Sequence, residues 1–452
     1  TLTSMDLNGI RAELTELRNY ILKVEEEQTR RLERVHPDHR GAAQNLIHYL
    51  ALRAIDHQML QEQLTSIGLS SLRNSEARVL DNLNLVLHWL SEDQCNDIPV
   101  PVQKIHPAQR MKERADKLFG HRDTWSPHIM VTLSSQMNNT PAELADLLRS
   151  GMSAVRINCG HDSEQEWTEM LESLRLASEE TGESCSVYFD LSGPKIRIKE
   201  LFDKQRSSVK ALPVKPGDRL FISKYPYEKA HYVKGYMTVR PKKVFVGLEV
   251  GKRILFDDGI IHGEVVAISD EGAEIEITYT DKASRKLKPE KGVNFPGKGL
   301  KLKAVTAKDI TDLDFLKDHA DVVGLSFVNN ASDVHQIIDE MEARGMHETG
   351  LVVKIETASA FEDLPIILLA LMRHKRIGLM IARGDLGLEV GWERLAEVQE
   401  EILWLAEAGW IPTIWATQVL EKLTKQGIPT RAEITDAAAG IRAECVMLNK
   451  GK

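Results

Sequence analysis

Eight short apolar runs alternate with helix-like segments from residue 128 to the end of this 452-residue sequence. In order, the runs are HIMVTL at 128–133, AVRIN at 154–158, SVYFDL at 186–191, DVVGLSF at 321–327, GLVVKIE at 350–356, IGLMIA at 377–382, IPTIWAT at 411–417 and CVMLN at 445–449. Parallel strands are joined by crossover helices, so the alternation predicts an α/β fold, a (β/α)8 or TIM barrel. A doubly wound open sheet is the alternative, because the pattern alone does not close a barrel.

The helix-like segments carry start and stop signals. Three of them open with capping boxes, which run from Thr140 to Glu143, Ser163 to Glu166 and Thr430 to Glu433. Glycines stand where helices should stop, at Gly151, Gly182, Gly345 and Gly409. The last run ends at Asn449, close to the end of the sequence, so we expect the eighth helix to be missing from it.

Two regions interrupt or precede the alternation. Residues 201–295 are rich in β-branched residues and turn signals, which predicts a small all-β domain inserted after the third strand as a β-barrel lid. Residues 1–124 predict a helical N-terminal module, with an apolar seam in its first helix, further helices at about 41–66 and 75–90, and a stiff connector at 98–101. The barrel itself is expected at 125–200 and 296–452.

Composition excludes some classes of function. The net charge of −9 comes from interspersed charges of both signs, which does not suit nucleic-acid binding. Four scattered cysteines indicate a reduced, intracellular protein, and no apolar run is long enough to span a membrane. We therefore expect a cytoplasmic protein. The first residue is not Met, so a removed targeting segment stays open.

The stretch 351–387 holds the clearest candidate site. Lys354 and Glu356 lie two apart at the end of one run, so they face the same way on a strand. Asp385 closes the next run, and residues 358–372 between the runs suit a crossover helix. Two carboxylates and a lysine at neighbouring strand ends suit Mg²⁺ and an anionic substrate. The plainer interpretation is a surface ion pair at strand ends.

A closed barrel would bring further polar residues to the same end. They are Arg156, Asn158, Asp190, Arg197, Ser326, Arg383 and Thr417. Arginine grips phosphate oxygens bidentately and lysine neutralises developing negative charge, so the set suits phosphoryl transfer. Each residue also has a structural interpretation. Arg156 or Arg197 would then pair with Asp190, and the Thr417 hydroxyl would bond to the backbone.

Ordered motifs over residues 128–449 resemble the pyruvate kinase family. They are VRINCGHD at 155–162, FDLSGPKIRI at 189–198, FDDGII at 256–261, KGVNFPG at 291–297, KIE at 354–356, MIARGDLGLE at 380–389, ATQVLE at 416–421 and PTRAEITDAA at 429–438. The resemblance implies transfer of a phosphoryl group from phosphoenolpyruvate to ADP, which gives pyruvate and ATP. The family's barrel with a β domain inserted after strand three matches the fold expected here.

The resemblance also implies roles for single residues. Glu356 and Asp385 would bind the divalent metal, Mg²⁺ or Mn²⁺, and the backbone at Gly384 and Asp385 would hold the substrate carboxylate. Arg156 and Lys354 would stabilise the phosphoryl group, and Thr417 would lie where the enolate is protonated. Asn158 and Asp190 match two potassium ligands, and Arg197 matches a phosphate-contacting arginine.

Several positions depart from the family pattern. Gly160 replaces a potassium-binding serine, and Lys195 stands where potassium-dependent members carry Glu. Members that do not need potassium have Lys there, so we expect K⁺ not to be required. Ser134-Ser135, Asn329-Asn330 and residues 449–452 also differ from the family near the site. The family's C-terminal domain is absent, so we expect a homo-oligomer with a non-standard interface.

Two other functions remain open on the sequence alone. A Mg²⁺-dependent lyase or aldolase acting on pyruvate-like acids would also place a Glu and an Asp at strand ends, and residues 355–358 resemble its signature. A non-catalytic sensor or scaffold would keep the fold and use the helical module instead. The inserted lid and Lys354 argue against the lyase, and the retained site residues argue against the scaffold.

Overall fold

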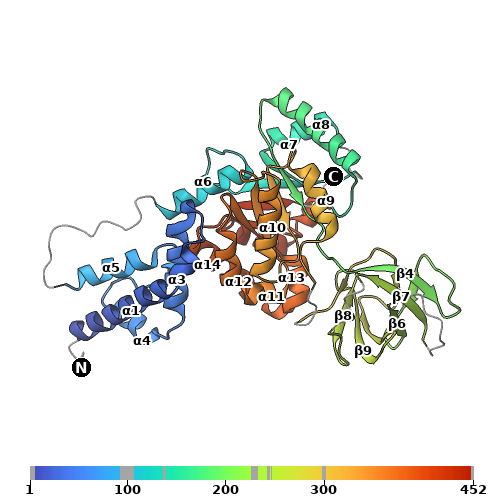
Figure 1. Cartoon of the computed structure of the whole chain (residues 1–452), viewed down its shortest axis with the longest axis horizontal. Coiled ribbons are helices and arrows are strands. Elements are labelled where there is room, and N and C mark those ends of the chain that lie inside the picture. Colours follow the sequence, from blue (N-terminus) through green and yellow to red (C-terminus); the bar gives the residue numbers. More distant parts are fainter. Residues whose placement is uncertain are drawn as a thin grey trace.

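A computed structural model describes residues 6–91, 106–135, 139–224, 233–241, 245, 247–297 and 302–448. Figure 1 shows three parts in a row: the N-terminal helices, a central barrel wrapped by helices, and an inserted β unit. The connector expected at 98–101 and the residues after 448 lie outside the described residues. None of the helices in the described ranges combines the length and apolarity that crossing a bilayer requires.

The central strands close into a parallel barrel in the order β1-β17-β16-β15-β14-β13-β3-β2. Their bounds are His128–Leu133 for β1, Met152–Asn158 for β2, Ser186–Asp190 for β3, Val322–Leu325 for β13, Gly350–Ile355 for β14, Ile377–Ala382 for β15, Thr413–Ala416 for β16 and Cys445–Leu448 for β17. The predicted barrel is therefore confirmed, and the open-sheet alternative is wrong. Since all eight strands are parallel, their carboxyl ends meet at one face.

Helices cover the outside of the barrel (Figure 1). They are α7 (Pro141–Arg149), α8 (Glu164–Thr181), α9 (Ala307–Leu316), α10 (Ala331–Ala343), α11 (Ala358–Glu362), α12 (Leu364–Leu371), α13 (Arg383–Val390), α14 (Trp392–Ala408), α15 (Glu421–Gln426) and α16 (Arg431–Gly440). All three predicted capping boxes form. The single helix expected at 358–372 is wrong: the chain breaks at Asp363, and Pro365 lies in the first turn of α12, where a missing N–H costs nothing.

The inserted β unit lies between β3 and α9. Its strands are β4 (Arg197–Asp203), β5 (Leu212–Val214), β6 (Arg219–Ser223), β7 (Gly235–Arg240), β8 (Arg253–Phe256), β9 (Ile261–Ser269), β10 (Gly272–Thr280), β11 (Arg285–Leu287) and β12 (Val293–Asn294). Seven of them form a sheet in the order β12-β8-β9-β10-β6-β7-β4, around its own apolar core. A bridge between Arg197 and Gly292 joins the entering and leaving chain, which sets the unit beside the barrel's carboxyl face.

The N-terminal helices form a small bundle. Their bounds are Leu7–Glu27 for α1, Thr29–Leu32 for α2, Pro37–His39 for the 3₁₀ turn η1, Arg40–Arg53 for α3, Gln58–Ser66 for α4, Glu76–Arg78 for η2, Val79–Trp89 for α5 and Pro107–Phe119 for α6. The predicted seam is buried from Ile10 to Ile21. The helix expected at 41–66 is wrong, because α3 ends at Arg53 and α4 begins at Gln58.

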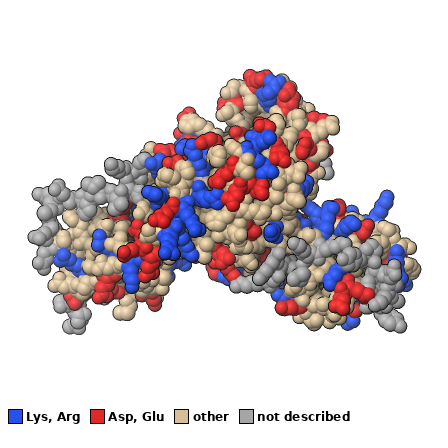
Figure 2. All heavy atoms as spheres, viewed as in Figure 1, with Lys and Arg blue, Asp and Glu red and all other residues tan. Residues whose placement is uncertain are grey.

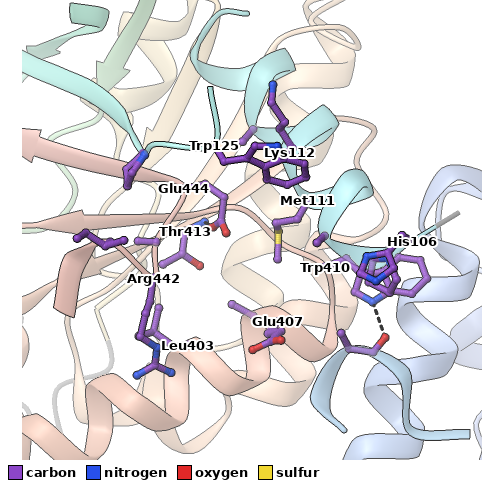
Figure 3. Close-up of a pocket in the computed structure, with 18 of the residues that line it drawn as sticks. His106, Met111, Lys112, Trp125, Leu403, Glu407, Trp410, Thr413, Arg442 and Glu444 are labelled. Carbon is purple, nitrogen blue, oxygen red and sulfur yellow. Dashed lines mark hydrogen bonds between the residues drawn. The ribbon is translucent and has the colours of Figure 1, made fainter. Parts of the chain in front are cut away.

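Several contacts fasten this bundle to the barrel, among them two side-chain hydrogen bonds. Asn45 Nδ2 lies 2.9 Å from the Ala408 carbonyl at the end of α14. The Trp410 indole donates to the Ala77 carbonyl at 3.0 Å, the bond drawn as a dashed line in Figure 3. These bonds satisfy polar groups at the junction, so they fix the orientation of the bundle on the barrel and also stabilise the contact.

Helix α6 belongs structurally to the barrel. Leu118 and Phe119 are buried in a cluster with Met130, Val352 and other inward side chains of the barrel strands. The Leu118 side chain lies against the glycines that open β14 and β15, where an added Cβ would come within 2.6 Å and 3.0 Å of it. The helix thus seals the amino-terminal end of the barrel and leaves chemistry to the opposite face.

Candidate active site

A cavity of about 760 Å³ opens at the carboxyl face of the barrel. Of the predicted site residues, it is lined by Arg156, Asn158, Asp190, Lys195, Arg197, Ser326, Lys354, Glu356 and Asp385. Arg240 and Pro241 of the β unit line it from the other side. The strand-end positions, far apart in the sequence, therefore do converge.

Asp190 is the centre of the buried charge in this cavity. It accepts from Arg156 Nε at 2.9 Å and lies 3.1 Å from Lys354 Nζ. Ser326 Oγ donates to the same carboxylate at 3.3 Å. Burial acts to raise the pKa of Asp190, but the charges of Lys354 and Arg156 outweigh it and hold the pKa below its ordinary value. Asp190 thus stays ionised and orients both cations.

Glu356 follows β14 and is almost fully buried. Its Oε1 accepts from the Phe327 backbone N–H at 3.0 Å and lies 3.4 Å from Lys354 Nζ. Burial raises the pKa of Glu356; the charge of Lys354 acts in the opposite direction, and the charge of Asp385 adds to the increase. The two carboxylates therefore repel each other across the cavity.

Asp385 lies in the first turn of α13, directly after β15. Its oxygens accept from Lys195 Nζ at 3.1 Å and 3.2 Å and from Asn294 Nδ2 at 3.3 Å. Burial acts to raise the pKa of Asp385, but Lys195 and Asn294 hold it below its ordinary value. This carboxylate is ionised, and its partners come from the β unit and from the loop that leads into it.

The residues present fit a divalent cation. Glu356 and Asp385 are hard oxygen ligands whose repulsion a dication would offset. The described residues contain no group of three or more His, Cys, Asp and Glu placed for a metal, so protein ligands would fill only some positions. Mg²⁺ tolerates this arrangement, since it keeps waters and substrate oxygens as its other ligands.

Thr417 and Gly384 adjoin the cavity without lining it. A Cβ on Gly384 would lie 2.7 Å from Thr417 Cγ2, so only glycine permits the approach. Thr417 has a φ of 74°, which is strained for a β-branched residue and costs about 1–3 kcal/mol. Such strain is typical of functional turns, because the surrounding structure must hold it in place.

Arg383 does not join the cationic set that we expected. Its guanidinium pairs with Asp436 of α16 and donates to the carbonyls of Ala416 and Thr417 at 2.7 Å and 2.6 Å. It also stacks over the Trp415 ring, 4.4 Å from the centroid. Arg383 therefore faces away from the cavity and supports the strained turn at Thr417.

Some of the side chains that we expected at a monovalent-ion site are already engaged in hydrogen bonds within the protein. The Asn158 side-chain oxygen accepts from the Gly160 N–H at 2.9 Å. Arg197 reaches the cavity, although its Nη1 donates to the Glu290 carbonyl at 2.8 Å. The buried Ser192 hydroxyl beside them has no hydrogen-bond partner among the residues that the structure describes. This corner keeps oxygen atoms, but the Asn158 side-chain oxygen is already bonded within the protein.

Sequence reasoning missed three residues of the site. Asn294 contacts Asp385, Thr132 Oγ1 accepts from Arg156 Nη1 at 3.2 Å, and Ser192 lines the cavity. Asn294 and Ser192 fall inside quoted motifs, so the motifs marked the segments without singling out the side chains. Thr132 is the penultimate residue of the first strand and lies two residues after the inward Met130, so strand alternation was the signal that could have found it.

Comparison with known proteins settles the family. A family model described as "Pyruvate kinase, barrel domain" matches residues 125–451. The chain belongs to the pyruvate kinase family. The family assignment covers the barrel and the inserted β unit, which together carry every residue of the cavity described above. The N-terminal helices before residue 125 lie outside the match.

Individual pyruvate kinases are similar over the same region. That of Geobacillus stearothermophilus is 32% identical over 310 residues, which are 68% of this chain and 50% of that protein. That of Agrobacterium vitis is 31% identical over 331 residues, 71% of this chain and 64% of that protein. That of Dictyostelium discoideum is 30% identical over 318 residues, 68% of this chain and 58% of that protein. The chain thus spans about half to two thirds of the length of these relatives.

Proposed function

We propose that this chain transfers a phosphoryl group from phosphoenolpyruvate to ADP and releases pyruvate and ATP. One observation carries the proposal: Arg156, Lys354, Glu356 and Asp385 all line one cavity at the carboxyl face of a barrel that belongs to the pyruvate kinase family. The names of the relatives in that family point to the same reaction.

The cationic side chains act on the phosphoryl group. Arg156 and Lys354 are fixed by Asp190, so they present positive charge to the cavity without reorganisation during the reaction. Glu356 and Asp385 hold Mg²⁺ or Mn²⁺, which when bound supplies charge neutralisation and orients substrate oxygens. Backbone N–H groups at Gly384 and Asp385, in the first turn of α13, hold the substrate carboxylate.

Thr417 takes part at the other reacting centre. When the phosphoryl group leaves, the remaining enolate needs a proton at carbon. Thr417 lies against Gly384 at the end of β16, and Arg383 binds its carbonyl, so its hydroxyl has a fixed position. We assign it to orienting that proton transfer.

Lys195 makes the reaction independent of potassium. Burial acts to lower the pKa of Lys195, but the charges of Asp385, Asp258 and Glu356 outweigh it and raise the pKa above its ordinary value. The ammonium is therefore permanently charged inside the cavity. It supplies the monovalent charge that Gly160 and the internally bonded Asn158 no longer provide a site for.

We also propose a cytoplasmic location and a homo-oligomer with an interface of its own. The exposed apolar side chains Ile428, Ile434 and Ile441 around α16 offer a surface for such an interface. Light scattering after size exclusion of wild-type and Ile434→Lys protein tests it. A wild-type mass equal to one chain contradicts the proposal.

The deciding experiment is a coupled assay for pyruvate from phosphoenolpyruvate and ADP, with Lys354→Met as the matched variant. We expect turnover of the variant to fall by about three orders of magnitude or more, while binding of phosphoenolpyruvate with Mn²⁺ persists. Lys317→Met is the control and should keep wild-type turnover, since Lys317 is an exposed residue at the end of α9 that does not line the cavity. Equal rates for wild type and Lys354→Met would remove the lysine from the mechanism.

A further inference from the structure

A second cavity, of about 480 Å³, lies at the opposite end of the barrel. It opens where η1, α6 and the segments entering β14 and β15 meet. Five cationic side chains line it: Arg110, Arg114, Lys117, Lys375 and Arg376. Its acidic residues are Asp38, Glu113 and Glu348. Figure 2 shows Lys and Arg gathered where the N-terminal helices meet the barrel.

Arg114 has no carboxylate partner among the described residues. Its guanidinium donates instead to the carbonyls of Trp410 at 2.5 Å and Asp38 at 2.8 Å. Burial, with the nearby charge of Arg110, lowers the pKa of Arg114 to about 10. The charges of Asp38 and Glu113 act in the opposite direction, but they do not outweigh burial and Arg110.

Arg376, like Arg114, lines the cavity and donates its hydrogen bonds to backbone carbonyls. Its Nη1 donates to the Glu348 carbonyl at 2.7 Å, and its Nη2 donates to the Lys117 carbonyl. Its Nε is buried without a hydrogen-bond partner among the described residues. Burial lowers the pKa of Arg376 as well. The charges of Asp321 and Glu348 offset this only in part, so Arg376 is a second cation of the cavity whose hydrogen bonds go to backbone carbonyls.

Two of the acidic residues of the cavity pair with two of its cations. Glu113 pairs with Arg110 at 3.3 Å, and Glu348 pairs with Lys375 at 2.5 Å. Asp38 Oδ2 lies 3.8 Å from the His36 ring. Within the described part of the chain, five cationic side chains line the cavity against three acidic ones, and Arg114, Arg376 and Lys117 form no ion pair there. Charge held this way is costly unless a counter-ion binds.

We propose that this cavity binds a small phosphate-bearing molecule that joins the N-terminal helices to the barrel. Two guanidinium groups suit the bidentate recognition of phosphate oxygens, and Lys117 adds a point charge. The volume is in the range of small-molecule sites, which occur preferentially at domain junctions. This cavity shares no lining residue with the catalytic one, so the inference does not rest on the catalytic function.

The position of the cavity connects the proposed ligand with the catalytic cavity through two barrel strands. Glu348 precedes β14, and Arg376 precedes β15. The far ends of these two strands carry Lys354, Glu356 and Asp385. A ligand here contacts α6 and η1 together with both strand entries, so it stabilises the docked arrangement of the whole junction.

Titration calorimetry of the full chain in EDTA tests the site, with inorganic phosphate, pyrophosphate and glycerol 3-phosphate as probes. We expect saturable binding of at least one probe, weakened about tenfold or more in Arg114→Gln. Glycerol 3-phosphate binding above inorganic phosphate identifies a phosphate ester as the ligand class, and the reverse identifies the free ion. No binding of any probe at 10 mM, about the weakest affinity worth assigning to a site, would overturn the proposal.

Three further variants keep the result interpretable. Lys117→Gln changes an exposed side chain and should weaken binding several-fold even if Arg114→Gln unfolds. Arg175→Gln removes an exposed arginine on α8 and should leave the affinity unchanged. Lys354→Met should also bind as the wild type does. Binding that is lost only in Lys354→Met would place the probe in the catalytic cavity and defeat the inference.

Discussion

The ammonium of Lys195 lies 3.1 Å from one oxygen of Asp385 and 3.2 Å from the other. The two residues are 190 positions apart, and the contact joins the loop that leads into the β unit to the first turn of α13. A fixed positive charge therefore stands next to a carboxylate that we assign to the metal. Under the proposed function, this ammonium takes the place of a bound potassium ion.

Reversing that charge should create a need for potassium. In Lys195→Glu, the ammonium is lost and a carboxylate stands beside Asp385, so we expect turnover without K⁺ to fall by about 100-fold or more. Added K⁺ should restore part of it. Wild-type turnover should change less than about twofold between K⁺ and tetramethylammonium. Lys199→Glu, an exposed change on β4, is the control. Strong K⁺ activation of the wild type would contradict the role of Lys195.

Removing one metal carboxylate should weaken metal binding. Glu356→Gln keeps the shape of the side chain and its bond from the Phe327 N–H but loses its charge, so we expect Mn²⁺ affinity to fall by about tenfold or more. Electron paramagnetic resonance of free Mn²⁺ measures this directly. Glu169→Gln, on the exposed face of α8, should bind as the wild type does. Unchanged affinity in Glu356→Gln would exclude that residue as a ligand.

Glu444 should make the fold less stable as pH rises. Burial raises its folded-state pKa from 4.5 to about 7. Below 4.5 both states are protonated, and between the two values only the unfolded state ionises. The free energy of unfolding should therefore fall by up to about 3 kcal/mol across that window and stay reduced above pH 7.

The neutral variant Glu444→Gln isolates this effect. It keeps an oxygen for the Thr413 N–H, which donates to Glu444 at 2.8 Å. We expect its stability advantage over wild type, measured by urea denaturation, to be larger at pH 8 than at pH 5. The same comparison with Glu169→Gln should show no such difference. An advantage that does not change with pH would mean that Glu444 ionises normally.

Truncating Leu118 should destabilise the base of the barrel. Leu118 is 1% exposed and packs against the strand entries at Gly350 and Gly378. We expect Leu118→Ala to lower the free energy of unfolding by about 2–5 kcal/mol. Leu176→Ala makes the same change at a residue that is 40% exposed and should cost much less. Equal losses of unfolding free energy in the two variants would show that α6 does not stabilise the amino-terminal end of the barrel.

The sequence predicted the barrel well because eight strands and their helices repeat one pattern with clear signals. Capping boxes and strand-end charges are local, so Lys354, Glu356 and Asp385 could be found one by one. What brings them together is closure of the sheet, which is non-local. Pairings such as Lys195 with Asp385 depend on how the β unit folds back, and no spacing in the sequence encodes that.

The errors have local physical causes. Residues 41–66 and 358–372 each look like one apolar helix, yet one breaks before Gln58 and the other breaks at Asp363. Arg383 stands two positions before Asp385 in the sequence, but the first turn of α13 sends the two side chains to different sides. Its partner Asp436 lies 53 residues further on, out of reach of any short motif.

Because α6 closes the amino-terminal end of the barrel, it determines where the chain can be shortened without exposing the barrel interior. A fragment trimmed to the 125–451 match would remove Leu118 and Phe119 and leave Met130, Val352 and Met380 facing water. We expect such a fragment to aggregate rather than to fold into a stable barrel. Anyone who expresses the catalytic half alone should therefore retain the segment from Pro107 onwards, even though it shares no family signature.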